Sequence, residues 1–254
     1  MIPVLVRANP LWRPLRRPSS RAHWLAAAVL VLVPLATHAA DVVTDALQQA
    51  YAPYRTALFK TNGKSQDESR AALDAARAAL AQVRTRFGTQ PPAPYDRDVR
   101  FGATLDQVAT VYAKAAAEIG RNELAAAHET LEAARDLLAA LRLRNGVVVF
   151  SDAMNEYHEV MEQVLIEGPK WLATAAGRFR LTTTAGALEH LAQRLERQAS
   201  PDLTAQADFQ NALVAVRQSV QALLDALAQG DEAAIRSAMG QLKGPYSRMF
   251  QRFG

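Results

Sequence analysis

Two histidine–glutamate pairs are the residues whose types and spacing could do chemistry. His128 is followed by Glu132, and His158 is followed by Glu162. In a helix this i, i+4 spacing puts both side chains of a pair on one face. Imidazole nitrogens and carboxylate oxygens are ligands of iron, zinc and copper. Each pair therefore supplies two candidate ligands for a transition-metal site.

Two methionines flank His158 at helical spacing. Met154, His158 and Met161 stand at i, i+4 and i+7. Thioether sulfur favours Cu(I), so these methionines would bias a site at His158 toward copper. The same pattern has a structural interpretation, because Met154 and Met161 also fall on core positions of the expected helix, where methionine fills gaps. Both interpretations stay open.

The distance between the two pairs depends on the turn between them. Gly146 is placed to end the helix that carries His128, and the chain then enters the helix that carries His158. With the two helices antiparallel, the histidines are offset by about six residues, or roughly 9 Å along the axis. This offset leaves open whether the pairs form one site or two.

Familiar catalytic motifs are missing from the sequence. It has no E-x-x-H pair for a di-iron centre, no G-x-S-x-G, no P-loop and no H-E-x-x-H. Cysteine is also absent, which excludes disulfides, thiolate metal sites and covalently attached c-type haem. We therefore expect a protein that is not an enzyme.

The elements that position these residues are expected to be helices. Apolar residues recur at alternating spacings of three and four from Leu47 onward, which predicts an all-α fold of eight helices. A shift of 108 residues aligns the apolar pattern of 101–146 with that of 209–254 without a gap. Short turns favour antiparallel neighbours. The sequence thus predicts two tandem up-down-up-down four-helix-bundle units, 41–146 and 147–254.

Residues 1–40 have the pattern of a secretory signal peptide. Five arginines and no acidic residue lie in 1–24, before a short apolar run at 25–36 that is followed by small residues. The whole chain has 29 basic and 25 acidic residues, so the remainder carries a net charge of −1. A nucleic-acid surface needs clustered positive charge, and that class is excluded. We expect a periplasmic protein with no stable membrane span after signal cleavage.

The predicted units resemble the small soluble b-type cytochromes of the periplasm. The resemblance rests on a helix pair, the loop "TQPPAPYD", Phe101 with "LDQV", and the turn "GRNELAAA". It implies haem ligation by a methionine of the first helix and a histidine of the fourth. In the second unit, Met154 matches the methionine, but the last helix of that unit offers Met249 and no histidine. The haem-ligand pair is thus incomplete, which disfavours haem b and leaves Met154 and Met249 as the cofactor-binding candidates.

The sequence favours a non-enzymatic helical-bundle protein that binds a ligand or a protein partner. A metal ion, copper or iron, is the first ligand to test, with Met154, His158, Met161, Glu162, His128 and Glu132 as its expected ligands. One alternative is a ligand-free bundle with an interaction or chaperone-like role. A haem b electron carrier is the other.

Overall fold

The computed structural model describes residues 41–63 and 65–254, and this part of the chain is all helical, without a strand. The predicted all-α class is confirmed. The signal peptide predicted over residues 1–40 lies outside the described residues. The described residues lie within one compact unit.

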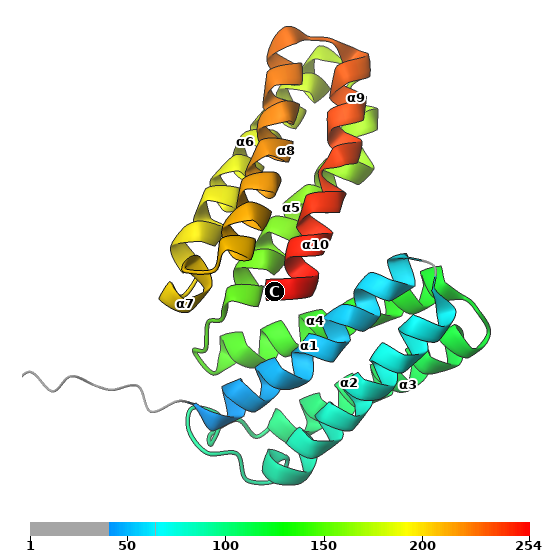
Figure 1. Cartoon of the computed structure of the whole chain (residues 1–254), viewed down its shortest axis with the longest axis vertical. Coiled ribbons are helices and arrows are strands. Elements are labelled where there is room, and N and C mark those ends of the chain that lie inside the picture. Colours follow the sequence, from blue (N-terminus) through cyan, green and yellow to red (C-terminus); the bar gives the residue numbers. More distant parts are fainter. Residues whose placement is uncertain (1–40, 64) are drawn as a thin grey trace, which may run out of the picture. The chain divides into compact units, whose positions relative to one another are not determined.

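Four long helices make up the first half of the described chain (Figure 1). They are α1 (Val42–Asn62), α2 (Gln66–Phe87), α3 (Phe101–Gly120) and α4 (Leu124–Arg144). Helix α1 packs on α2 and α4, and α3 packs on α2 and α4. We call these four helices the first helical group.

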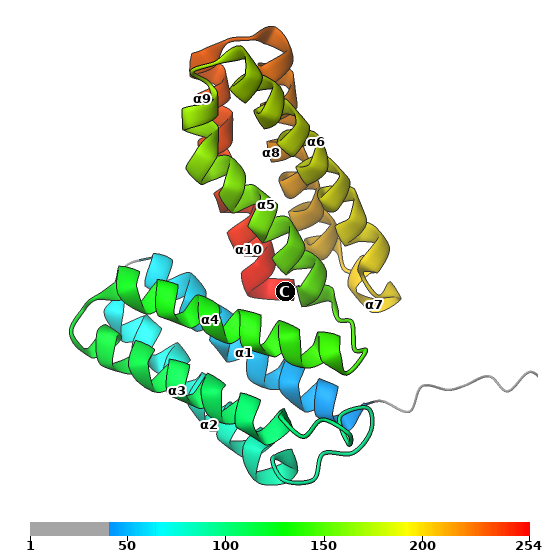
Figure 2. The same ribbon diagram turned by 180° about the vertical axis from the view of Figure 1, so that it is seen from behind.

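Six helices make up the second half, and we call them the second helical group. They are α5 (Phe150–Trp171), α6 (Ala175–Gln198), α7 (Pro201–Thr204), α8 (Ala207–Gln229), α9 (Glu232–Gln241) and α10 (Lys243–Phe253). Helix α5 packs on α6, α9 and α10, and α8 packs on α6, α9 and α10. Helix α1 also contacts α10, as the two opposite views show (Figures 1 and 2).

The helices form where the apolar pattern predicts them because that pattern becomes their buried face. In α5, for example, Met154, Tyr157, Met161 and Val164 are fully buried at spacings of three and four. Helix ends follow local chemistry. Asp41 caps α1 by accepting hydrogen bonds from two backbone N–H groups, and Gly230 ends α8 in the left-handed conformation that glycine adopts readily.

The structure differs from the expected eight helices at two points. The last helix is split into α9 and α10, because Pro245 has no N–H to continue the hydrogen bonds of α9. A short helix, α7, fills the turn after α6. Helix α5 begins at Phe150, and Asp152 caps its first turn by accepting from the N–H of Val149.

None of the described helices is long and apolar enough to cross a membrane.

Candidate functional site

Helices α4 and α5 bring the two histidine–glutamate pairs together. Gly146, with φ of 67°, lets the chain turn after α4 and enter α5. Glu132 Oε1 lies 3.7 Å from His128 Nε2 and 3.9 Å from His158 Nε2. Glu162 Oε1 lies 3.5 Å from His158 Nε2. The question that the sequence left open is thus answered, because the two pairs form one cluster with Glu132 between the imidazoles.

The ring of His128 is oriented by α1. Its Nδ1 lies 3.0 Å from the carbonyl oxygen of Leu58 and 3.1 Å from Thr61 Oγ1. A carbonyl oxygen only accepts, so Nδ1–H of His128 donates to it. In the neutral ring the proton is then on Nδ1, and the lone pair of Nε2 faces Glu132. Burial lowers the pKa of His128 from its ordinary value.

Arg135 orients the ring of His158, and its contact with Nδ1 is that of a donor, whereas Nδ1 of His128 meets an acceptor. Arg135 Nη1 lies 2.9 Å from His158 Nδ1, and both side chains are largely buried. A guanidinium has donors only, so Nδ1 of His158 accepts this hydrogen bond. In the neutral ring the proton is then on Nε2, which faces Glu132 and Glu162.

Two cations balance the two carboxylates of the cluster. Arg135 Nη1 lies 3.8 Å from Glu132 Oε1, and Lys243 Nζ of α10 lies 3.5 Å from Glu162 Oε1. The neighbouring His158 imidazole and Lys243 lower the pKa of Glu162 to about 2. Glu162 is therefore ionised throughout the physiological range, and so remains available as an anionic ligand.

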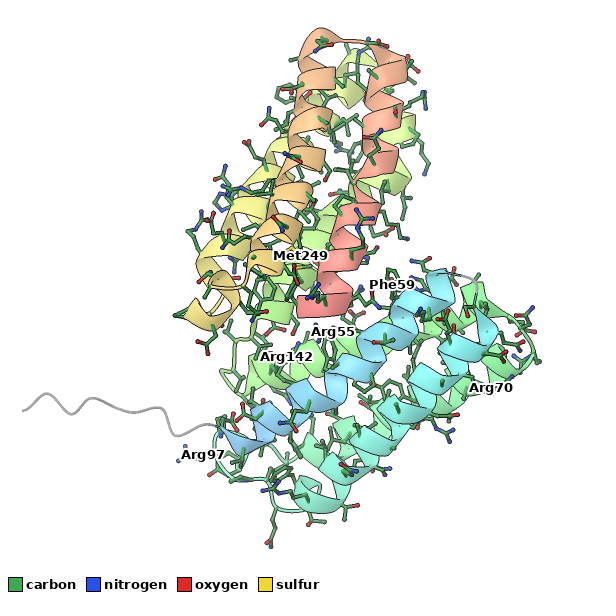
Figure 3. The ribbon with its side chains drawn as sticks, viewed as in Figure 1. Arg55, Phe59, Arg70, Arg97, Arg142 and Met249 are labelled. Carbon is green, nitrogen blue, oxygen red and sulfur yellow. The ribbon has the colours of Figure 1, made fainter. Side chains whose placement is uncertain are left out.

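A small cleft of about 30 Å³ opens beside the cluster. A cavity needs about 10–15 Å³ of such space to hold one water molecule, so the cleft has room for a water molecule or a single ion. Phe59, Tyr246 and Phe250 give it apolar walls, with Phe59 on the α1 side (Figure 3). The polar lining comes from Asn62, His128, Glu132, Arg135, His158, Lys243 and Ser247.

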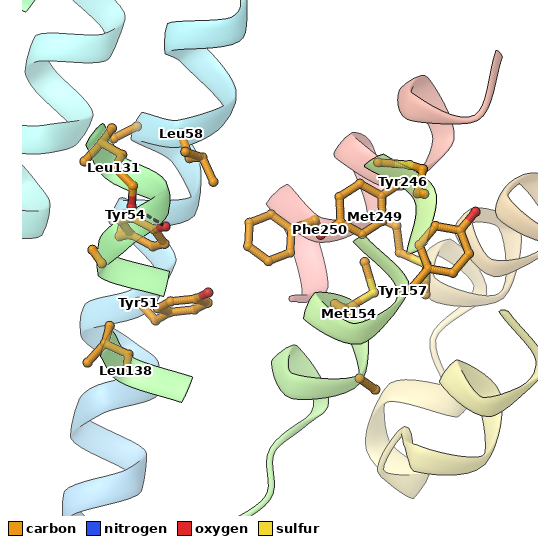
Figure 4. Packing of buried hydrophobic residues seen from close by; sticks show 14 of the residues in the cluster. Tyr51, Tyr54, Leu58, Leu131, Leu138, Met154, Tyr157, Tyr246, Met249 and Phe250 are labelled. Atoms are coloured by element: carbon orange, nitrogen blue, oxygen red, sulfur yellow. Dashed lines mark hydrogen bonds between the residues drawn. The ribbon is translucent and has the colours of Figure 1, made fainter. Parts of the chain in front are cut away.

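The methionines predicted as ligands lie in the core. Met154, Met161 and Met249 are fully buried, and none of them lines the cleft. Figure 4 shows Met154 and Met249 close to each other beside Tyr157. The structure thus separates the six residues predicted to bind metal into two sets: it brings the two histidines and two glutamates together and leaves the methionines in the hydrophobic core.

The cluster does not have the geometry of a loaded metal site. Among residues 41–63 and 65–254, no group of three or more histidine, aspartate or glutamate side chains is arranged so that it could hold an ion as it stands. Any ion would therefore have to draw its ligands together.

No family model, curated protein or solved structure matches this chain. The geometry of the cluster is therefore the main guide to function.

Sequence reasoning missed the two basic members of the cluster. Arg135 follows His128 by seven residues and Glu132 by three, so helical spacing places it on the same face of α4 and could have identified it. No spacing in the sequence relates Lys243 to the other members of the cluster. This lysine reaches the cluster only because α10 packs against α5.

Proposed function

We propose that the protein is a non-enzymatic periplasmic helical-bundle protein that binds a divalent first-row transition ion at the His128–Glu132–His158–Glu162 cluster. The observation that carries this proposal is the position of Glu132, whose carboxylate faces both imidazoles. Two imidazoles and two carboxylates are a donor set suited to zinc, copper(II) or iron(II).

The spacing of the donor atoms supports the proposal. In a tetrahedral site with metal–ligand bonds of about 2.0–2.1 Å, neighbouring donor atoms are about 3.3–3.4 Å apart. Three of the six donor pairs that four ligands make lie 3.5, 3.7 and 3.9 Å apart. Each pair would have to close by a few tenths of an ångström. The burial of the methionine sulfurs in the core favours a divalent ion over the Cu(I) that the sequence suggested.

We also infer that the two helical groups are tandem four-helix-bundle units of shared design, as the 108-residue shift of the apolar pattern predicts, and that each unit resembles a b-type cytochrome. A shift of 108 residues places α3 on 209–228, where α8 spans Ala207–Gln229. The same shift places α2 on 174–195, where α6 spans Ala175–Gln198. In this arrangement the cluster is built where the last helix of one unit meets the first helix of the next.

The metal proposal is tested by titrating the purified protein with Zn²⁺ and Cu²⁺ in a calorimeter. We expect one ion per chain, and a loss of affinity of about 100-fold or more in His158→Ala, because a lost ligand costs at least as much as a lost hydrogen-bond partner of a ligand. His190→Ala is the matched control, since His190 is exposed on α6. Equal affinities in the wild type and in His158→Ala would contradict the proposal. A visible spectrum with a haem band would instead support the electron-carrier alternative.

A further inference from the structure

The two histidines of the cluster differ in the hydrogen-bond partner of Nδ1, and only His128 has the partner that a metal-binding histidine needs. A histidine that binds metal through Nε2 carries its remaining proton on Nδ1, which needs an acceptor. His128 has that acceptor in the carbonyl oxygen of Leu58, 3.0 Å away. His158 has a donor in the same position, because Arg135 Nη1 lies 2.9 Å from its Nδ1.

The contact with Arg135 opposes metal binding at His158. An ion at Nε2 would move the ring proton to Nδ1, where it would meet an N–H of the guanidinium, and two donors repel each other. Arg135 must therefore withdraw before His158 can bind. A second partner is in reach, because Asp136 Oδ1 lies 3.3 Å from Arg135 Nε and Asp136 is exposed.

The same contact joins the two helical groups. Arg135 belongs to α4 and His158 to α5, so the contact links the last helix of the first group to the first helix of the second. Loading of the cluster would replace this hydrogen bond with coordination bonds from both helices. The link between the groups would thus be exchanged rather than lost.

We propose that Arg135 is an internal competitor of the metal ion for the His158 imidazole, so that metal loading and release of Arg135 are one event. This inference rests on the proposed function and adds the residue that regulates the site. Arg135 acts through His158 and Glu132 and is not itself a ligand.

The closing experiment compares zinc affinities of the wild type, Arg135→Gln, Arg135→Lys and Arg70→Gln. The amide oxygen of glutamine can accept from Nδ1–H, so Arg135→Gln should bind Zn²⁺ about tenfold more tightly than the wild type, as expected for a hydrogen-bond partner of a metal ligand. Lysine keeps a donor there and should give no gain. Arg70→Gln makes the same chemical change at an exposed position of α2 and should leave the affinity unchanged (Figure 3).

A second measurement reads the ring of His158 without metal. Long-range proton–nitrogen NMR spectra of the metal-free wild type should show the proton of neutral His158 on Nε2, and that of His128 on Nδ1. A proton on Nδ1 of His158 in the wild type would overturn the inference whatever the zinc affinity.

The zinc titrations separate the two proposals. Equal, measurable affinity in the wild type and in Arg135→Gln would overturn the role of Arg135 while leaving the metal function in place. Binding by Arg135→Gln alone would support the competition and show that the native chain does not load. Absence of binding in both proteins would overturn the metal function and, with it, the competition.

Discussion

At the cluster, one hydrogen-bond partner sets the chemistry of each imidazole. His128 and His158 are both largely buried and both face Glu132, yet a carbonyl oxygen holds one ring and a guanidinium holds the other. Because the carbonyl accepts and the guanidinium donates, the two neutral rings carry their protons on different nitrogens. Residue type and spacing alone do not distinguish the two histidines.

The buried ring of His128 should make the fold sensitive to mild acid. Burial holds the pKa of His128 below its ordinary value, and nearby Lys243 and His158 add to this, while Glu132 and the Leu58 carbonyl act in the opposite direction. The unfolded chain, with an ordinary histidine pKa of about 6.5, then takes up the proton first. The free energy of unfolding should therefore fall as the pH drops below about 6.5.

Urea unfolding at pH 7.5 and at pH 5.5 measures this effect. The urea midpoint of the wild type should be lower at pH 5.5 than at pH 7.5. This decrease should be smaller in His128→Gln, which keeps a donor for Leu58 and loses the titrating group. His190→Gln should behave like the wild type because His190 is exposed. An unchanged pH dependence in His128→Gln would exclude His128 as the sensitive group.

Much of the candidate site could be predicted from the sequence, because its ligands come in local pairs. The i, i+4 spacing identified His128 with Glu132 and His158 with Glu162, and the structure shows each pair on one helix face. The meeting of the pairs could not be predicted, since it depends on how the chain turns at Gly146. The methionines were open to two interpretations because core packing and metal binding use the same helical spacing.

At the scale of the helix, two glycines of α6 should respond in opposite ways to the same substitution. A Cβ at Gly177 would lie 2.1 Å from the backbone oxygen of Trp171, so alanine there would force the end of α5 and the start of α6 apart. A Cβ at Gly186 would meet no atom within 4 Å. Alanine there would simply restrict the unfolded chain and favour the helix.

Chemical unfolding of the two variants tests this contrast. Gly177→Ala should lower the free energy of unfolding by about 2 kcal/mol, as overpacking does. Gly186→Ala should raise it by about 0.5–1 kcal/mol. Effects of the same sign in the two variants would contradict the close approach of the α5–α6 turn.

At the scale of the whole molecule, the helices were largely predictable and their assembly was not. The three-and-four spacing of apolar residues, together with the turn residues, located the long helices, because each of these helices buries a regular apolar stripe. The split between α9 and α10 was missed because the apolar stripe continues through Pro245 while the backbone hydrogen bonds do not. The contact of α1 with α10 joins segments almost 200 residues apart, and no local pattern encodes it.

The two helical groups are also joined by a largely buried ion pair, and its loss should destabilise the fold. Arg142 of α4 is only 2% exposed, and it donates from Nε to Asp152 of α5 at 3.0 Å. Asp152 also caps α5 by accepting from the N–H of Val149 at 3.1 Å. Removal of one partner of a buried pair leaves the other charge without compensation.

Arg142→Met should therefore lower the free energy of unfolding by about 3 kcal/mol, measured by urea denaturation at pH 7. The double variant Arg142→Met with Asp152→Asn should recover part of this loss, because asparagine can still cap the helix and carries no charge. Arg121→Met is the control, since its ion pair with Glu123 is exposed and should contribute less than about 1 kcal/mol. If Arg142→Met and Arg121→Met had equally small effects, the ion pair would not be a structural link between the two helical groups.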